Sequence, residues 1–225
     1  MPDNAEELDR LRADNARLRL LLDRADAPAE LRHRMRSTIA LLRQVITRSA
    51  DRAVDIEDYV AHLLDRIDAI AQAQSAADDR GAIDLHSLIA DTLHRFRIIE
   101  GERLRMSGPA VKFNAKPGQA LALAIHELAL NAVQHGSLGV DLGQLDIHWE
   151  MKGETAGRAL AFTWRETGSV PAAEKAEPGF GTEVLEQLLP YELKAAVALK
   201  QDAGGLSCVI RLPWHERLGA IEPSA

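Results

Sequence analysis

The sequence is poor in cysteine and in aromatic residues, and it contains no long apolar run. Cys208 is the single cysteine, so an intrachain disulfide is excluded; its place in an alternating apolar run predicts a core position, as suits a reducing compartment. No uninterrupted apolar segment is long enough to cross a bilayer, and the first residues lack the basic and then apolar pattern of a signal peptide. We therefore expect a soluble, cytoplasmic protein without membrane insertion.

The chain also has no excess of positive charge, since 27 Lys and Arg stand against 34 Asp and Glu. The formal charge is -7, which excludes a general electrostatic attraction to nucleic acid or to anionic lipid. Basic residues nevertheless gather around His33, and two interpretations remain open: a solvated helix face or a docking surface for an acidic partner. These residues are Arg32, Arg34, Arg36, Arg43 and Arg48.

What the chain has in quantity is apolar helix-forming sequence. Hydrophobic residues make up 46% of the chain, which is enough for real cores in one large or two small domains. Residues 1–27 carry Leu and Ala at alternating spacings of three and four, with Asn15 at an a-type position. This pattern predicts a coiled-coil helix that pairs with its own copy. The alternative is a single amphipathic helix packed on its own chain, and Pro28 then interrupts the helix.

Residues 28–75 are predicted to form a helical hairpin. Apolar residues at helical spacing favour helices over residues 31–48 and 56–71, and the short link between them requires an antiparallel arrangement. Two such helices bury little by themselves, so hairpins from two chains are expected to form a dimeric four-helix bundle. His33 falls between the apolar stripes and is expected to reach solvent. Residues 72–81 change in composition and are interpreted as the linker, bounded at 76–82.

Residues 83–214 mix strands and helices without strict alternation, which is typical of an α+β sandwich, and residues 215–225 are interpreted as a tail. Helices are predicted over 88–99, 117–135 and 182–189. Strands are predicted over 83–85, 104–106, 110–113, 144–152, 159–164, 193–201 and 206–212.

Three groups of residues in this part could carry chemistry. Glu127, Asn131 and His135 share one helix face, where the first two offer hard oxygen ligands for Mg²⁺; the alternative is a polar face open to water. The Gly179–Thr182 turn could approach phosphates before a helix, or Thr182 could simply cap that helix. Glu166 at a strand end near Trp164 could accept from an adenine amino group, or could be an ordinary exposed carboxylate.

The order and spacing of these segments resemble the HWE subfamily of bacterial histidine kinases over roughly residues 30–213. The family's acceptor helix reads like E-L-x-H-R-x-K-N, and it is matched by Glu30, Leu31, His33 and Arg34. Its nucleotide helix reads like H-E-L-x-T-N-A-x-K-Y-G, and His126, Glu127, Asn131 and Gly136 match. Its W-x-E matches Trp164 and Glu166, and its G-F-G matches residues 179–181.

The resemblance implies a dimeric helical hairpin joined to a Bergerat-type ATP-binding domain over residues 83–214. It implies that His33 is phosphorylated by ATP, that Asn131 holds Mg²⁺, and that Glu127 positions a Mg²⁺-bound water or polarises the acceptor histidine. Glu166 would read adenine. The nucleotide site would further include His126, Trp164, Gly168, Gly179, Phe180, Gly181 and Thr182.

The resemblance also implies partners: a second copy, a response-regulator receiver domain whose aspartate takes the phosphoryl group, and a separate sensor protein. The chain departs from the family pattern at Ser37, Leu130, Gln134–His135, Ser169 and Val170. Two other functions therefore stay open. One is a histidine phosphotransfer adaptor with a degenerate domain that does not bind ATP, and the other is a dimeric interaction protein without enzymatic activity.

Overall fold

The computed structural model describes residues 14, 17, 29–50, 56–153, 157–168, 179–202 and 204–221. Two compact units divide between Thr47 and Arg48, within helix α2 (Ala29–Ala50), and each is considered by itself. In the first unit, the helix predicted over residues 31–48 is confirmed as part of α2. The predicted coiled coil of residues 1–27 lies outside the described residues, apart from Asp14 and Arg17. Among the helices that the structure describes, none is both long and apolar enough to span a membrane.

In the second unit, α3 (Ile56–Arg80) is longer than the sequence pattern predicted. Residues 72–80, which the composition indicated as part of the linker, are helical. This segment contains no glycine or proline and is rich in alanine, so nothing stops the helix before Gly81, whose φ is +74°. Ala73 and Ala77 are buried, and Gln119 Nε2 donates to Gln74 Oε1 at 2.5 Å. These contacts fasten the end of α3 to α5 (Ala115–Gln134).

A five-stranded sheet forms the main layer, with strand order β2-β4-β5-β7-β6. The predicted pairing of residues 144–152 with 159–164 is confirmed by the antiparallel register of β4 and β5. Buried side chains recur at every second residue over most of β4. β2 is parallel to β4, and the other neighbours are antiparallel. Cys208 is buried on β7 as predicted, and burial raises the pKa of its thiol to about 12. The strands are β2 (Leu104–Ser107), β4 (Gln144–Lys152), β5 (Ala159–Thr167), β6 (Ala196–Asp202) and β7 (Gly205–Pro213).

A second, small sheet has the order β1-β3-β8, and its strands are β1 (Ile83–Asp84), β3 (Val111–Phe113) and β8 (Gly219–Ile221). The interpretation of residues 215–225 as a tail is wrong for residues 219–221. Asn114 draws this segment back by donating from Nδ2 to the carbonyls of Glu216 and Arg217. Gly219 has φ +156°, and a Cβ there would collide with the Lys112 carbonyl oxygen, so the pairing requires glycine.

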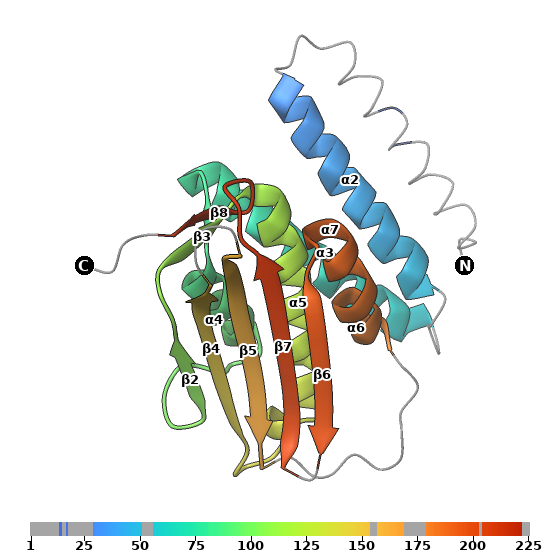
Figure 1. Ribbon diagram of the computed structural model, residues 1–225. Coiled ribbons are helices and arrows are strands. Elements are labelled where there is room, and N and C mark those ends of the chain that lie inside the picture. Colours follow the sequence, from blue (N-terminus) through green and yellow to red (C-terminus); the bar gives the residue numbers. More distant parts are fainter. Residues whose placement is uncertain are drawn as a thin grey trace. The chain divides into compact units, whose positions relative to one another are not determined.

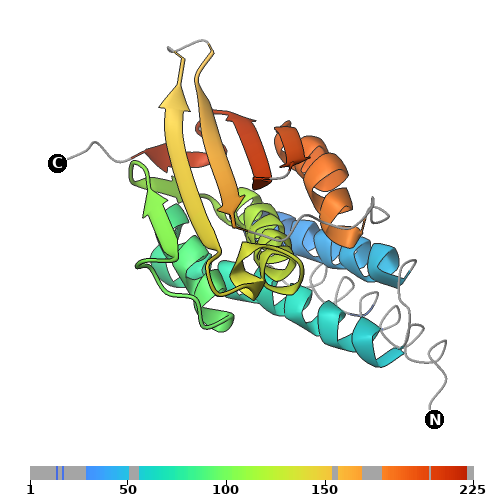
Figure 2. The ribbon, with the colours of Figure 1, turned by 90° about the horizontal axis from the view of Figure 1, so that it is seen from below.

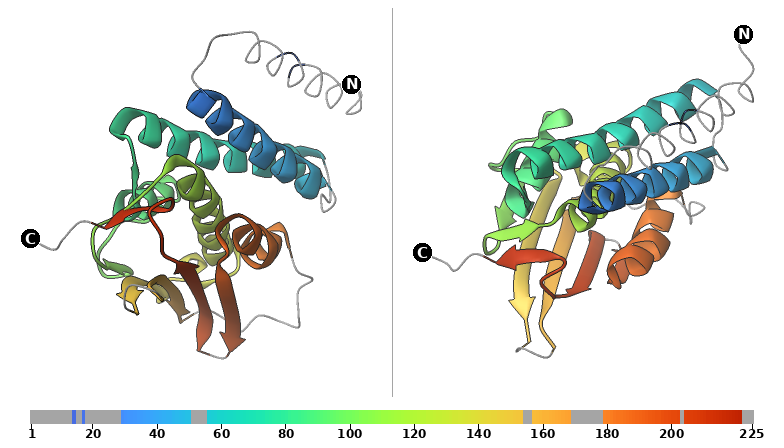
Figure 3. Two further views of the ribbon diagram at one scale, coloured as in Figure 1. Left: turned by 45° about the horizontal axis from the view of Figure 1, so that its top comes forward. Right: turned by 90° about the horizontal axis from the view of Figure 1, so that it is seen from above.

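Helices cover one face of the main sheet (Figures 1 and 2). α5 lies between the sheet and α3 (Figure 3), which explains why its residues are buried nearly all round from Pro117 to Ala129. α4 (Leu85–Arg95) starts at Asp84, whose Oδ1 accepts from the Ser87 amide at 2.8 Å. The helix predicted over 182–189 is part of a longer helical run: α6 (Phe180–Glu183), a π-helical segment (Val184–Leu188) and α7 (Leu189–Leu193). Leu193, predicted to begin a strand, therefore ends a helix.

Candidate functional site

The polar face of α5 meets the glycine turn. A Cβ atom placed on Gly181 would lie 3.2 Å from Glu127 Oε2 and 3.2 Å from Asn131 Nδ2. Gly181 is buried, so a larger residue would push directly on both side chains. Glycine at 181 thus brings the turn's backbone against the carboxylate and the carboxamide.

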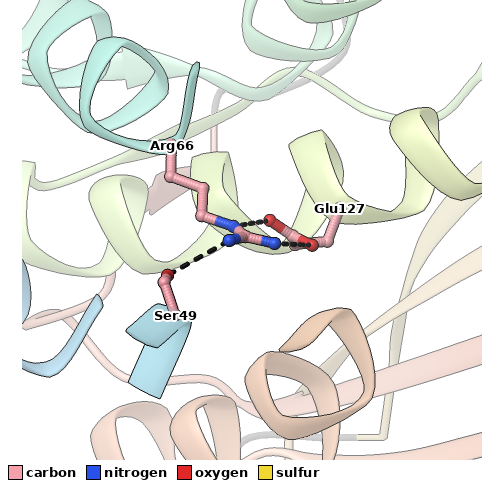
Figure 4. A network of polar contacts seen from close by, with 3 residues as sticks. All are labelled: Ser49, Arg66 and Glu127. Carbon is pink, nitrogen blue, oxygen red and sulfur yellow. Dashed lines mark hydrogen bonds and ion pairs between the residues drawn. The ribbon is translucent and has the colours of Figure 1, made fainter. Parts of the chain in front are cut away.

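Arg66 of α3 joins this group. Its Nε lies 2.7 Å from Glu127 Oε1 and its Nη2 lies 3.2 Å from Oε2, while Nη1 donates to Ser49 Oγ at 3.1 Å (Figure 4). The guanidinium carbon also lies 3.9 Å from the centre of the Phe180 ring. The paired side chains of Arg66 and Glu127 are 10% and 3% exposed, so the ion pair is shielded from water.

A second arginine, Arg48, forms hydrogen bonds with the helical run that follows the glycine turn. Arg48 Nη1 donates to Glu183 Oε1 at 3.0 Å and to Gln187 Oε1 at 2.8 Å. Because Glu183 ends α6, this contact holds the segment directly after Gly181. Thr182 lies inside α6 and does not cap it, since the N-cap position belongs to Gly179.

Glu166, next to the last residue of β5, is only 2% exposed, so the alternative of an ordinary exposed carboxylate is excluded. Its Oε2 accepts from the Ser137 amide at 2.8 Å, and its Oε1 accepts from Trp164 Nε1 at 3.0 Å. A Cβ on Gly136 would collide with Glu166 Oε2, so glycine is needed where α5 ends. The carboxylate therefore lies against Gly136 and Ser137, directly after the end of α5.

Arg103 holds the loop that supplies the Ser137 amide. Its guanidinium donates to the carbonyl oxygens of Ser137, Leu138, Val140 and Gly143, at distances between 2.5 and 3.3 Å. Gly168 faces this loop, and its φ of +76° favours glycine. By holding these four carbonyls, the Arg103 guanidinium fixes the loop of residues 137–143. It thereby fixes the position of the Ser137 amide, which donates to Glu166.

The structure does not bring His126 into either group. Its ring lies against Phe96, with centroids 5.8 Å apart, and the side chain is 1% exposed. Among the described residues, neither ring nitrogen has a hydrogen-bond partner. Burial lowers the pKa of His126 below 6.5, with smaller opposing and reinforcing effects of neighbouring charges, so the imidazole is neutral at pH 7.

The remaining predicted site residues are placed as follows. His33 lies in α2, where its backbone is helical and its side chain is outside what the structure describes. Gly179 is exposed, and a Cβ there would meet nothing within 4 Å, so the fold itself does not require glycine. His135 is exposed at the end of α5. Ser169 and Val170 lie outside the described residues.

The donor set of this site suits the phosphate end of a nucleotide better than a protein-only metal site. In the described parts of the chain, no group of three or more His, Cys, Asp and Glu side chains could hold a metal ion. Asn131 offers one carboxamide oxygen, and Mg²⁺ in such sites takes its other ligands from phosphates and water. Because residue 181 is glycine, no side chain at this position would keep a phosphate away from the backbone of the turn.

Sequence reasoning missed Arg48, Arg66 and Arg103. A signal for Arg66 does exist: it occupies the same helical stripe as the buried Ile70, Ala73 and Ala77, at spacings of four, three and four. A charged residue on an apolar stripe needs a buried partner. No signal in the sequence identifies that partner as Glu127.

Comparisons with known proteins identify the family. Residues 30–110 match the family model of the HWE histidine kinase. The chain is 31% identical over 195 residues to blue-light-activated histidine kinase 1 of Erythrobacter litoralis, covering 84% of this chain and 53% of the relative. It is also 31% identical over 186 residues to the blue-light-activated histidine kinase of Rhizobium johnstonii, covering 82% and 52%. The chain thus spans about half the length of these curated relatives.

Solved structures share the fold. The blue-light-activated histidine kinase of Erythrobacter litoralis matches with a TM-score of 0.60 and 16% identity, over 84% of this chain and 62% of that one. The separate histidine kinase domain of that protein matches with a TM-score of 0.58 and 18% identity, over 96% of each chain. These likenesses confirm the predicted fold class, in which N-terminal helices precede a mixed α/β catalytic domain. On the family match and the relatives together, the chain belongs to the HWE histidine kinase family.

Proposed function

We propose that the protein is a two-component histidine kinase that phosphorylates its own His33 with ATP and passes the phosphoryl group to an aspartate of a response regulator. The observation that carries the proposal is the meeting of Gly181 with Glu127 and Asn131 on α5. It brings an oxygen ligand, a carboxylate and a close-approaching backbone to one place, and these are the parts that phosphoryl transfer needs.

Each end of the site has a separate task in this proposal. Asn131 would hold Mg²⁺, whose charge neutralises the phosphates, and the turn of residues 179–181 would border them. Glu127 would orient a Mg²⁺-bound water or polarise the acceptor histidine. Glu166 has each oxygen bonded once by the protein, and each keeps a second lone pair that can accept from an adenine amino group.

The reaction forms one bond and breaks one. The unprotonated imidazole nitrogen of His33 bonds to the γ-phosphorus, the bond from that phosphorus to the bridging oxygen breaks, and ADP leaves with the electron pair. In the second step the aspartate oxygen of the receiver replaces the histidine nitrogen on phosphorus. The part of this chain is to align donor and acceptor and to balance charge.

A phosphotransfer adaptor that does not use ATP is the second candidate. Leu130 and Gln134 favour it, because the family pattern has threonine and lysine there, and Gln134 is exposed without a positive charge. The adaptor would keep His33 as an acceptor but would draw its phosphoryl group from another protein.

Two measurements decide between the candidates. Calorimetry with ATP and Mg²⁺ is expected to show saturable binding to the kinase and none to the adaptor. Incubation with γ-labelled ATP is expected to label the wild type and not His33→Ala. His94→Ala serves as the matched control, since His94 is exposed on α4 away from the site and its loss should leave labelling intact. Equal labelling of wild type and His33→Ala would reject His33 as the acceptor.

Partners also belong to this proposal: a receiver domain, a separate sensor protein and a second copy of the chain. α3 supports self-association, because Ile56, Val60 and Leu64 recur every four residues and are 60%, 45% and 56% exposed. Such a stripe exposes an apolar surface that proteins usually cover by association.

A further inference from the structure

Arg66 is the point where three separate segments of the second unit meet. One guanidinium pairs with Glu127 of α5, donates to Ser49 at the end of α2, and stacks on Phe180 of the glycine turn (Figure 4 shows the first two contacts). The residue as a whole is 8% exposed. α3 comes from the part of the chain predicted to form the hairpin, whereas Glu127 and Phe180 belong to the part predicted to bind nucleotide.

The geometry of the pair is specific. Two parallel contacts, Nε to Oε1 and Nη2 to Oε2, fix the plane of the Glu127 carboxylate as well as its position. Lysine, a point charge on a flexible stem, would attract the carboxylate without fixing its plane. Removing either member of a buried pair leaves the other charge without compensation.

The pair also changes the charge that a bound nucleotide would meet. Glu127 lies one helical turn before Asn131, so its carboxylate is close to where phosphates are proposed to bind. A bare carboxylate would repel a triphosphate, and Arg66 cancels its charge. The sequence of α5 offers no lysine or arginine near Asn131, because Gln134 stands where the family pattern has lysine.

The stacking contact between Arg66 and Phe180 also positions the glycine turn. A cation over an aromatic ring attracts it, the more so where water is excluded. Phe180 is 6% exposed beneath Arg66, and the next residue, Gly181, packs on Glu127 and Asn131. The same guanidinium therefore sets the carboxylate and holds the turn against α5.

We propose that Arg66 is a positioning residue of the phosphate end of the nucleotide site, which orients and neutralises Glu127 and holds the 179–181 turn in place. This inference rests on the proposed function, because it takes a Mg²⁺-nucleotide as the ligand. Arg66 acts through Glu127 and Phe180 and does not itself contact the nucleotide.

The test compares Arg66→Gln, Arg66→Lys, Glu127→Gln and the double variant Arg66→Gln/Glu127→Gln. Autophosphorylation is expected to fall on the order of 10- to 100-fold in Arg66→Gln. Arg66→Lys should recover part of the loss, because lysine restores the positive charge but not the two parallel hydrogen bonds to Glu127. In the double variant the loss should be clearly smaller than the product of the two single losses, since both changes break one unit. Arg95→Gln is the matched control: Arg95 faces Asp65 and Asp68 of α3 at 3.7 and 3.8 Å, away from Glu127.

Binding separates positioning from general damage to the fold. Calorimetry should show that Arg66→Gln binds Mg-ADP more weakly than the wild type does. Adenosine lacks phosphates, so its dissociation constant, measured from shifts of the amide NMR signals, should be the same for wild type and variant. Equal losses for both ligands would indicate a merely structural role. Unchanged or increased autophosphorylation in a folded Arg66→Gln would also overturn the proposal, and an increase would make Arg66 an inhibitory latch. Because Arg66→Gln could unfold, Arg66→Lys, which keeps the buried charge compensated, is measured in the same way.

A failure of the proposed function would be recognised separately. Wild-type protein that neither binds Mg-ADP nor labels His33 would reject the kinase. Hydrogen exchange would then still test the inference: amides of residues 180–183 should exchange faster in Arg66→Lys and Arg66→Gln than in wild type and Arg95→Gln. Equal exchange in all four proteins would show that Arg66 does not hold the turn.

Discussion

The backbone amide of Ser137 donates to Glu166 Oε2 across 2.8 Å, while Trp164 Nε1 occupies the other oxygen of the same carboxylate. The donor follows α5 and the acceptor ends β5, so the contact exists only when helix and strand are packed together. It leaves the carboxylate buried and oriented, with each oxygen accepting one N–H from the protein.

Glu166→Gln is expected to destabilise the protein and to weaken nucleotide binding. One oxygen becomes an NH₂ group that faces an N–H donor, which leaves a buried donor unsatisfied at a cost of about 1–3 kcal/mol. In a protein of this size each kcal/mol lowers the unfolding midpoint by about 2–4 °C, measurable by calorimetry. Glu150→Gln, at a surface position of β4, is the control and should leave the midpoint unchanged. An unchanged midpoint in Glu166→Gln would contradict the prediction.

Asn131→Ala is expected to lower autophosphorylation on the order of 100-fold or more without unfolding the domain. The carboxamide is the proposed Mg²⁺ ligand, whereas alanine is a better helix former at this half-buried position. Labelling with γ-labelled ATP and circular dichroism measure the two effects. Gln134→Ala, exposed three residues further along α5, should behave like wild type. A folded Asn131→Ala that labels normally would show that the metal is held elsewhere.

Stability is expected to fall as the pH drops below about 6.5, because of His126. Burial lowers the pKa of this histidine in the folded protein, Glu127 and Asp65 oppose the shift, and Arg95 and Arg66 add to it. The unfolded chain therefore binds more protons than the folded one below pH 6.5, so the free energy of unfolding decreases on acidification. His126→Leu should flatten the dependence of the free energy of unfolding on pH between 5 and 7, measured in urea. His94→Leu should keep the pH dependence of the wild type. If the free energy of unfolding of His126→Leu depends on pH as steeply as that of the wild type, other groups cause the effect.

Val60→Asp combined with Leu64→Asp is expected to shift the protein from dimer to monomer. The two residues belong to the exposed apolar stripe of α3, and a charge there cannot be buried against a second copy without a large cost. Light scattering at micromolar concentration measures the mass. Leu142→Asp changes an equally apolar side chain that is 90% exposed in another part of the second unit, and should leave the dimer intact. A monomeric wild type would rule out this interface.

Local periodicity explains which features the sequence pattern predicts correctly. Buried side chains alternate over most of β4, apolar residues repeat at helical spacing in α3, and the i, i+4 relation of Glu127 and Asn131 places both on one helix face. These features depend on near neighbours in the chain. Residues 72–80 are the exception, because their many polar residues hide a helix in which Ala73 and Ala77 are buried.

The sequence by itself predicted most of the element types, the family pattern and the carboxylate, carboxamide and glycine residues proposed for the site. Only the tertiary structure decided that β8 returns to pair with β3, that Glu166 is buried under Ser137 and Trp164, and that Arg66 pairs with Glu127. The physical reason is sequence separation. Arg66 and Glu127 are 61 residues apart, and the partner of a buried charge is set by how two helices pack, which no pattern of neighbouring residues specifies.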